Sequence, residues 1–120
     1  FKIINDGHGH ECGDDTLRQV ARTMKESISK EDMVARWGGE EFLLLFVETP
    51  LAEARLTAER IREKVASAMV DCGGIPVSVT VTIGVAAYDP AQGIDANIRK
   101  ADDAMYRGKR LTKNCVVTEE

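Results

Sequence analysis

Two adjacent glutamates after a Gly-Gly pair form the most chemically suggestive stretch of the sequence. Residues 35–46 read ARWGGEEFLLLF, so Glu40 and Glu41 stand between a turn and an unbroken apolar run. Gly-Gly between two strand-like segments is typical of a tight β-hairpin turn. Neighbouring carboxylates repel each other, which costs free energy unless a cation or a substrate uses them. The stretch predicts either a metal- or substrate-binding hairpin or, more simply, a turn with solvated glutamates.

A glycine-rich loop near the start of the chain, NDGHGHECGD at residues 5–14, allows two interpretations. His8, His10 and Cys12 alternate, which first suggests zinc, but standard zinc sites pair their ligands at gaps of two to four residues and carry a second pair elsewhere. The same loop precedes a helix, where backbone N–H groups can meet a phosphate or a base. Asn5 and Asp14 carry the amide and the carboxylate that can together read a guanine edge.

A third candidate is the basic stretch KADDAMYRGKRLTKN at residues 100–114. Lys109 and Lys113 lie one turn apart if the helix persists. Two such lysines could clamp a terminal phosphate. They could equally complement the dipole at a helix C-terminus.

Size and charge restrict the class of protein. A chain of 120 residues suits one domain with a single core. The net charge of −4, without a basic block, argues against nucleic-acid binding and implies that metal ions would screen a phosphate ester. Three widely spaced cysteines suit reduced thiols in a cytosol, and no apolar run is long enough to cross a bilayer. We therefore expect a soluble cytoplasmic domain.

Hydrophobic periodicity predicts the elements that must position these residues. Asp14 or Asp15 is expected to cap the first helix, and Thr49 to cap a second helix with Pro50 at its first position. The predicted elements are a helix at 14–28, a hairpin of strands at 33–37 and 42–47, a helix from 49 to about 69, a chain break at 71–76, an alternating strand at 77–85, a helix from 94 and a short strand at 114–117. This order predicts an α/β (α+β) fold, a mixed sheet covered by helices. No strand is expected before the first helix, so the sheet would lack a member.

Taken together and in order, these motifs resemble the GGDEF domain of diguanylate cyclases, which condense two GTP molecules into cyclic di-GMP. The resemblance includes FKIIND, ARWGGEEF, AERIR, VTVTIGVA and ADDAMYRGK, and it runs from residue 1 to about residue 117. It implies a nucleotidyl-cyclase, palm-like fold and a single domain over residues 1–120. In this family the two glycines, here Gly38 and Gly39, let the backbone approach the nucleotide.

The resemblance also implies roles for the acidic pair. Glu40 matches the position that ligates Mg²⁺ or Mn²⁺ and is a candidate to help deprotonate the attacking ribose 3′-OH. Glu41 is the neighbouring catalytic-motif carboxylate. Two divalent ions would bridge the triphosphate and assist in-line attack on the α-phosphorus.

Substrate-binding positions follow in the same way. Asn5 and Asp14 match the guanine-reading positions, and His10 matches the GH of the loop. Lys109 matches a triphosphate contact. Lys113 stands where the family usually has Arg, which keeps the charge but loses the two-pronged donor geometry.

Two departures from the family pattern lead to further expectations. The family's leading strand, which carries a second metal-binding Asp, is not in this sequence; its absence would leave core apolar surface uncovered, and we expect negligible cyclase activity from these 120 residues alone. The inhibitory product site is degenerate, because Ser29 replaces its Arg while Asp32 and Arg60 match. We therefore expect little inhibition by cyclic di-GMP.

Partners are likewise implied by the resemblance. Two domains must face each other, so a homodimer is part of the mechanism, and an upstream sensory or receiver domain would set its geometry in a parent protein that could be membrane-anchored. One alternative is a non-catalytic module that binds GTP or cyclic di-GMP, or that only mediates dimerisation. Another is an unrelated palm-type nucleotidyl transferase, against which the guanine-reading pair argues.

Overall fold

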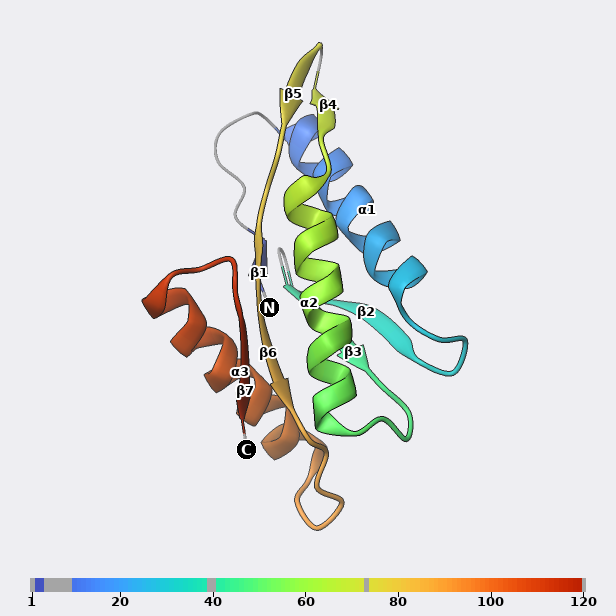
Figure 1. The fold of residues 1–120 in the computed structure, drawn as a ribbon, viewed down its shortest axis with the longest axis vertical. Helices are drawn as coiled ribbons and strands as arrows, with labels where there is room; N and C mark the ends of the chain where they lie inside the picture. Colours follow the sequence, from blue (N-terminus) through green and yellow to red (C-terminus); the bar gives the residue numbers. More distant parts are fainter. Residues whose placement is uncertain (1, 4–9, 39–40, 73, 120) are drawn as a thin grey trace.

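A five-stranded mixed sheet with helices on both faces forms the body of the molecule (Figure 1). The structure, a computed structural model, describes residues 2–3, 10–38, 41–72 and 74–119. In chain order the elements are β1 (Lys2–Ile3), α1 (His10–Ser27), β2 (Met33–Gly38), β3 (Glu41–Leu45), α2 (Leu51–Ser67), β4 (Val70–Cys72), β5 (Ile75–Val77), β6 (Val81–Ala86), α3 (Ile94–Leu111) and β7 (Val116–Glu119). The predicted α/β class is confirmed.

The order of the strands in the main sheet is β2-β3-β1-β6-β7. β1 runs antiparallel to both β3 and β6, whereas β6 and β7 are parallel. β3, β6 and β7 therefore all begin at the same edge of the sheet. β2, antiparallel to β3, ends at that edge.

The prediction that no strand precedes the first helix is wrong. β1 consists of two residues, and it pairs with β3 through Lys2 and with β6 through Lys2 and Ile3. A two-residue run carries too little pattern to be recognised in a sequence. In the fold it pairs because β3 and β6 both present backbone N–H and C=O groups that need partners.

Both predicted helix caps are also wrong. α1 begins at His10, so Asp14 and Asp15 lie inside the helix. Asp15 instead accepts a bond from Arg18, with 2.9 Å between Oδ1 and Nη1. At α2 the cap position is Pro50 in an extended conformation, and the Thr49 hydroxyl donates to the Val47 carbonyl rather than to the helix.

Strand residues occur within 71–76, where the sequence predicted an interruption of regular structure. β4 and β5 form a separate two-stranded sheet there. Gly74 adopts φ +88°, a conformation that favours glycine, and its N–H donates to Asp71 Oδ1 at 2.7 Å. The strand expected over 77–85 is consequently divided, since β5 ends at Val77 and β6 begins at Val81.

The alternation predicted for β6 is confirmed, and both of its faces are covered. Thr82 and Gly84 point toward α3, where a methyl group added to the glycine would overlap the α3 backbone. Ile83 and Val85 point to the opposite face, because successive strand side chains alternate. α2 covers this second face (Figure 1).

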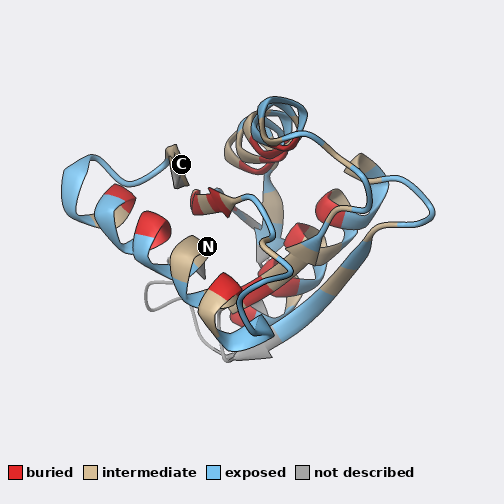
Figure 2. Cartoon of the chain, turned by 90° about the horizontal axis from the view of Figure 1, so that it is seen from below, coloured by how far each residue is buried: buried red, intermediate tan, exposed pale blue. Residues whose placement is uncertain are grey.

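The core is centred on the face covered by α1 and α2. Figure 2 shows its buried positions along the inner sides of the helices and on the central strands. The buried residues of this core cluster are Leu17, Val20 and Met24 of α1, Phe42 of β3, Ala54, Ala58, Ile61 and Val65 of α2, Val81, Ile83 and Val85 of β6, and Met105 of α3. No helix in the described ranges is both long and apolar enough to cross a bilayer.

Candidate functional site

Three described candidates, Gly38, Glu41 and Lys113, lie at or next to the sheet edge where β3, β6 and β7 begin (Figure 1). Lys2 lies opposite both Glu41 of β3 and Thr82 of β6. One residue further along β6, Ile83 lies opposite Val116 at the start of β7. The hairpin with the acidic motif and the turn that carries the second lysine are therefore at the same edge.

An irregular pairing shapes the base of the hairpin. Arg36 pairs with Phe42, yet Gly38 rather than Trp37 lies opposite Glu41, so the register shifts between Arg36 and Gly38. Such a bulge bends the strand and re-aims the residues beyond it. Phe42 is 7% exposed and anchors the start of β3, while Glu41 is half-buried. Gly39 and Glu40 lie outside the described residues, so the metal-binding role of Glu40 stays a prediction.

The predicted guanine-reading residues are only partly described. Asp14 is an exposed residue of α1, and Asn5 lies outside the described residues. His10 is the first residue of α1, and its side chain is likewise not described. The joint role of Asn5 and Asp14 therefore stays a prediction.

The two lysines lie in different local structures. Lys109 is half-buried in the last turn of α3, but the helix ends at Leu111 and Lys113 lies beyond it. The idea of two lysines on one continuing helix is wrong. The chain turns toward β7 because Lys113 and Asn114 adopt left-handed conformations, with φ of 54° and 46°. The Lys113 N–H donates to the Gly108 carbonyl at 3.0 Å, which closes the turn and leaves the Lys113 side chain exposed.

The carboxylate of the degenerate inhibitory site already has partners within the chain. Asp32 Oδ2 accepts from the Ser29 N–H at 3.0 Å, and Oδ1 accepts from the Val47 N–H at 2.9 Å. Asp32 thus joins the α1–β2 turn to the end of the hairpin. Arg60 is exposed, and its guanidinium donates to Thr57 on its own helix at 3.2 Å. This geometry agrees with the simpler interpretation of Asp32 as a turn carboxylate.

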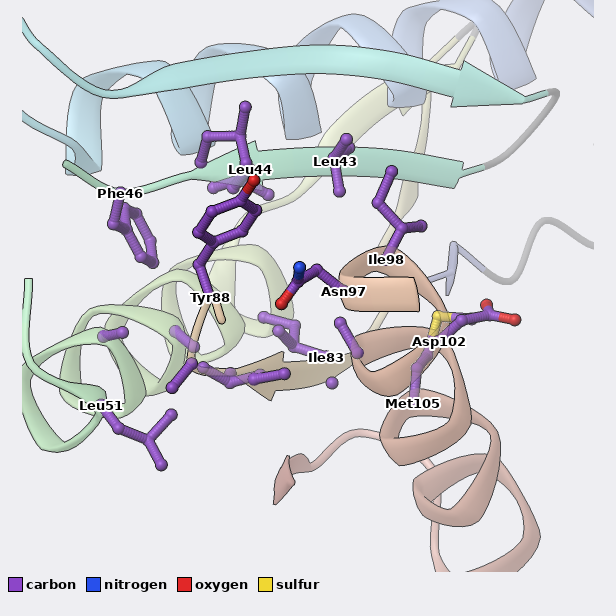
Figure 3. A pocket seen from close by; sticks show the side chains of 18 of the residues that line it. Leu43, Leu44, Phe46, Leu51, Ile83, Tyr88, Asn97, Ile98, Asp102 and Met105 are labelled. Carbon is purple, nitrogen blue, oxygen red and sulfur yellow. The ribbon is translucent and has the colours of Figure 1, made fainter. Parts of the chain in front are cut away.

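An apolar cavity of about 920 Å³ lies between β3, β6, α2 and α3 (Figure 3). Its hydrocarbon lining includes Leu43, Leu44 and Phe46 from the β3 side, Leu51 of α2, Ile83 of β6, and Ile98 and Met105 of α3. Asn97 also lines it, but this amide is engaged by the Asp89 and Gly93 backbone. Glu41 also lines the cavity, which therefore reaches the start of β3. Its mostly apolar lining would not replace the hydration of a triphosphate.

The described residues do not by themselves make a metal centre. Within the described ranges, no three His, Cys, Asp or Glu residues gather closely enough to hold an ion. His8 and Glu40 lie outside those ranges, and the Cys12 side chain is not described, so neither the zinc nor the magnesium interpretation is tested. Glu41 contributes one carboxylate at the sheet edge, the kind of oxygen donor that suits Mg²⁺ or Mn²⁺.

The fold is an α/β domain in which helices cover a mixed sheet. Its candidate phosphate site lies where strands end, beside the bulged hairpin and the turn that carries Lys113. The family described as "Diguanylate cyclase, GGDEF domain" matches residues 1–115. The chain belongs to this family, whose members depend on a metal ion.

Named relatives and solved structures agree with this assignment. The chain is 46% identical over 117 residues to the diguanylate cyclase DgcM of Escherichia coli, covering 98% of this chain and 28% of DgcM. It is 38% identical over 120 residues to the response regulator PleD of Caulobacter vibrioides, covering 98% of this chain and 26% of PleD. The structure matches the GGDEF domain of DgcB from Caulobacter crescentus in complex with c-di-GMP, with a TM-score of 0.87, 31% identity, and coverage of 92% of this chain and 67% of the other. The chain thus spans about a quarter of the length of these two curated relatives.

Proposed function

We propose that this chain is the catalytic domain of a diguanylate cyclase, a single GGDEF domain over residues 1–120. In the reaction, each of two GTP molecules uses its ribose 3′-oxygen to attack the α-phosphorus of the other. Two 3′-O–P bonds form, two bonds between the α-phosphorus and its bridging oxygen break, and two pyrophosphates leave. The observation that carries the proposal is the shared sheet edge, which brings together the Gly38–Glu41 hairpin base and the Lys113 turn.

The residues divide into three roles within this site. The hairpin acts on the reacting centre: Glu40 receives the 3′-OH proton, Glu41 supplies the adjacent carboxylate, and Gly38 and Gly39 let the backbone approach the nucleotide. Lys109 and Lys113 hold the negative charge of the triphosphate. The guanine contacts come from Asn5 and Asp14, with His10 beside them.

The carboxylates fit a hard divalent cation, and Glu40 is the residue that would hold it. When bound, Mg²⁺ or Mn²⁺, two ions per half-site, supplies charge neutralisation for the triphosphate in a chain whose own net charge is −4. In this proposal Glu40 also orients the hydroxyl.

The assembly follows from the reaction. Each domain binds one GTP, so two copies must face each other as a homodimer before both hydroxyls can attack. We further propose that a longer cytoplasmic protein carries the domain behind a sensory or receiver domain, which controls this encounter. No nucleic acid is involved.

The test is turnover by the longer protein that carries this chain. With GTP and Mg²⁺ we expect cyclic di-GMP by chromatography, and Glu40→Ala should reduce it at least about 100-fold, as expected for loss of a general base.

One observation favours a second candidate, a non-catalytic module that binds GTP or cyclic di-GMP. Lys113 stands in place of an Arg and cannot make a two-pronged phosphate contact. Nucleotide binding without turnover in the longer protein would select this candidate, and equal turnover by Glu40→Ala would contradict the role of Glu40.

A further inference from the structure

Arg62 links α2 to the turn that carries Lys113. Its Nη1 donates to Asn114 Oδ1 at 3.1 Å, across 52 positions of the chain. Its Nη2 donates to Glu59 Oε2 on its own helix at 3.2 Å. The Arg62 side chain is only 20% exposed, so both prongs of the guanidinium are held near the protein surface rather than extended into water.

The turn that Arg62 contacts is held from three directions. The Lys113 N–H donates to Gly108 of α3, and the Asn114 N–H donates to Thr82 Oγ1 of β6 at 3.2 Å. Thr82 is 2% exposed, so its hydroxyl is a fixed acceptor. Arg62 adds a third direction, from α2. Helix α3, strand β6 and helix α2 thus all converge on two successive residues.

This convergence matters because left-handed backbone is unfavourable for residues that carry a side chain. Lys113 and Asn114 both adopt it, and the surrounding bonds must maintain it. Asparagine tolerates the conformation better than most residues, and its side chain supplies the acceptor for Arg62. Losing that bond would let the turn relax and would redirect the exposed Lys113 side chain.

We propose that Arg62 is a positioning residue for Lys113, acting through the side chain of Asn114. The inference rests on the proposed function, in which Lys113 contacts the outer phosphates of GTP. Arg is needed because one guanidinium bridges two partners, Glu59 and Asn114, whereas a lysine ammonium is a point charge without a fixed fork. The motifs AERIR and ADDAMYRGK gave no sign that Arg62 and the turn meet.

A purely local role for Arg62 makes a different prediction. Pairs between Arg62 and the half-exposed Glu59, or the more exposed Glu63 at 3.8 Å, contribute little in water. If those pairs were all that mattered, replacing Arg62 would change neither nucleotide selectivity nor the turn. The hydrogen bond from Arg62 to Asn114 predicts instead a loss of affinity only for ligands that carry outer phosphates.

The experiment measures dissociation constants in the longer protein that carries this chain. The ligands are α,β-methylene-GTP, which cannot turn over, and GMP, which lacks the outer phosphates; both are titrated calorimetrically with Mg²⁺. We expect Arg62→Gln to raise the dissociation constant of the triphosphate about five- to tenfold, within the usual range of coupled contacts. The dissociation constant of GMP should stay within about twofold. Arg55→Gln is the matched control, since it makes the same change at an exposed position seven residues earlier on α2.

A second variant tests the route through Asn114. Asn114→Gly keeps a residue that accepts positive φ but removes the acceptor, so it should reproduce the selective loss. Combining it with Arg62→Gln should add nothing, because both remove the same bond. Equal triphosphate affinity in Arg62→Gln and Arg55→Gln, or additive losses in the double variant, would overturn the positioning role. An equal loss of GMP affinity would mean that Arg62 only supports the structure and does not position Lys113.

The failure of the underlying function gives a separate result. If the unmodified protein binds neither ligand, the GTP site itself is refuted and the role of Arg62 falls with it. If the unmodified protein binds α,β-methylene-GTP and Arg62→Gln binds it equally well, only the positioning role is refuted. Amide hydrogen exchange at residues 112–115 supplies a readout without nucleotide, and it should speed up in Arg62→Gln but not in Arg55→Gln.

Discussion

Strand β6 is closely packed against α3 but loosely packed on the side toward β3. On the α3 side, Gly84 has no side chain, and a Cβ there would overlap the Ala101 carbonyl oxygen and the Met105 nitrogen. On the β3 side, the strands are separated by the two-residue β1 and by an apolar cavity of about 920 Å³ (Figure 3). Most of the cavity lining is hydrophobic, yet the close contact between β6 and α3 is made at a glycine. Close packing here depends on fitted shape more than on apolar content.

The difference bears on function, because the tightly packed side carries the Lys113 turn. Gly108 of α3 also approaches closely, and a Cβ there would lie 2.8 Å from the Thr82 methyl group and 3.1 Å from Cys115 Sγ. α3, β6 and β7 therefore form a rigid base for the turn. Among the described residues that line the cavity, Glu41 is the one predicted site residue, and the Lys113 turn does not line it.

The largest effect should come from adding one methyl group on the tight side. Gly84→Ala forces α3 away from β6, because the obstructing atoms are backbone and cannot rotate aside. We expect a loss of about 3 kcal/mol in the free energy of unfolding, at the upper end of overpacking costs. Urea denaturation measures it. Gly93→Ala is the matched control, since nothing lies within 4 Å of a Cβ there. Equal stability of the two variants would show that the close approach is not needed.

A smaller effect should follow from removing the acceptor that joins β6 to the turn. Thr82→Val keeps the shape but leaves the Asn114 N–H without its 3.2 Å partner. We expect a loss of about 1–2 kcal/mol in unfolding free energy, the cost of an unmade bond in a partly buried site. Thr82→Ser restores the hydroxyl and should recover most of it. If Thr82→Val is as stable as the unmodified chain, the bond does not hold the turn.

The smallest effect should come from filling the cavity, with the opposite sign. Ala86 lies two residues from Gly84, on the same face of β6, and it lines the cavity. Ala86→Val adds two methyl groups to the cavity lining and should raise the unfolding free energy by about 0.5–1 kcal/mol. Ala35→Val, at an exposed strand position that does not line the cavity, should change it little. A clear loss of stability in Ala86→Val would mean that the space beside Ala86 is already closely packed.

Much of the fold followed from local patterns in the sequence. The stripe of Leu17, Val20 and Met24 predicted the first helix, and the Gly-Gly pair between apolar runs predicted the β2–β3 hairpin. These signals depend only on neighbours along one element, so they survive without knowledge of the rest. The end of α3 did not follow, because the stretch around Lys109 and Lys113 reads as helical.

Part of the candidate site could likewise be predicted from the sequence, and part could not. Motif order was sufficient to assign the family and to nominate Glu40, Glu41 and the two lysines. Asp32 matched a ligand position by spacing, yet the fold gives its two oxygens to Ser29 and Val47. A backbone partner 15 residues away cannot be inferred from spacing.

The sequence by itself determined the three helices, the β2–β3 hairpin, the family and the residue types available for chemistry, because periodicity and motif order are local properties of the chain. Only the tertiary structure decided that Thr82, Arg62 and Asn114 meet. These residues lie on three elements far apart in the sequence, and their contact depends on strand order and on how closely α3 packs against β6. The turn that carries Lys113 is therefore a product of packing.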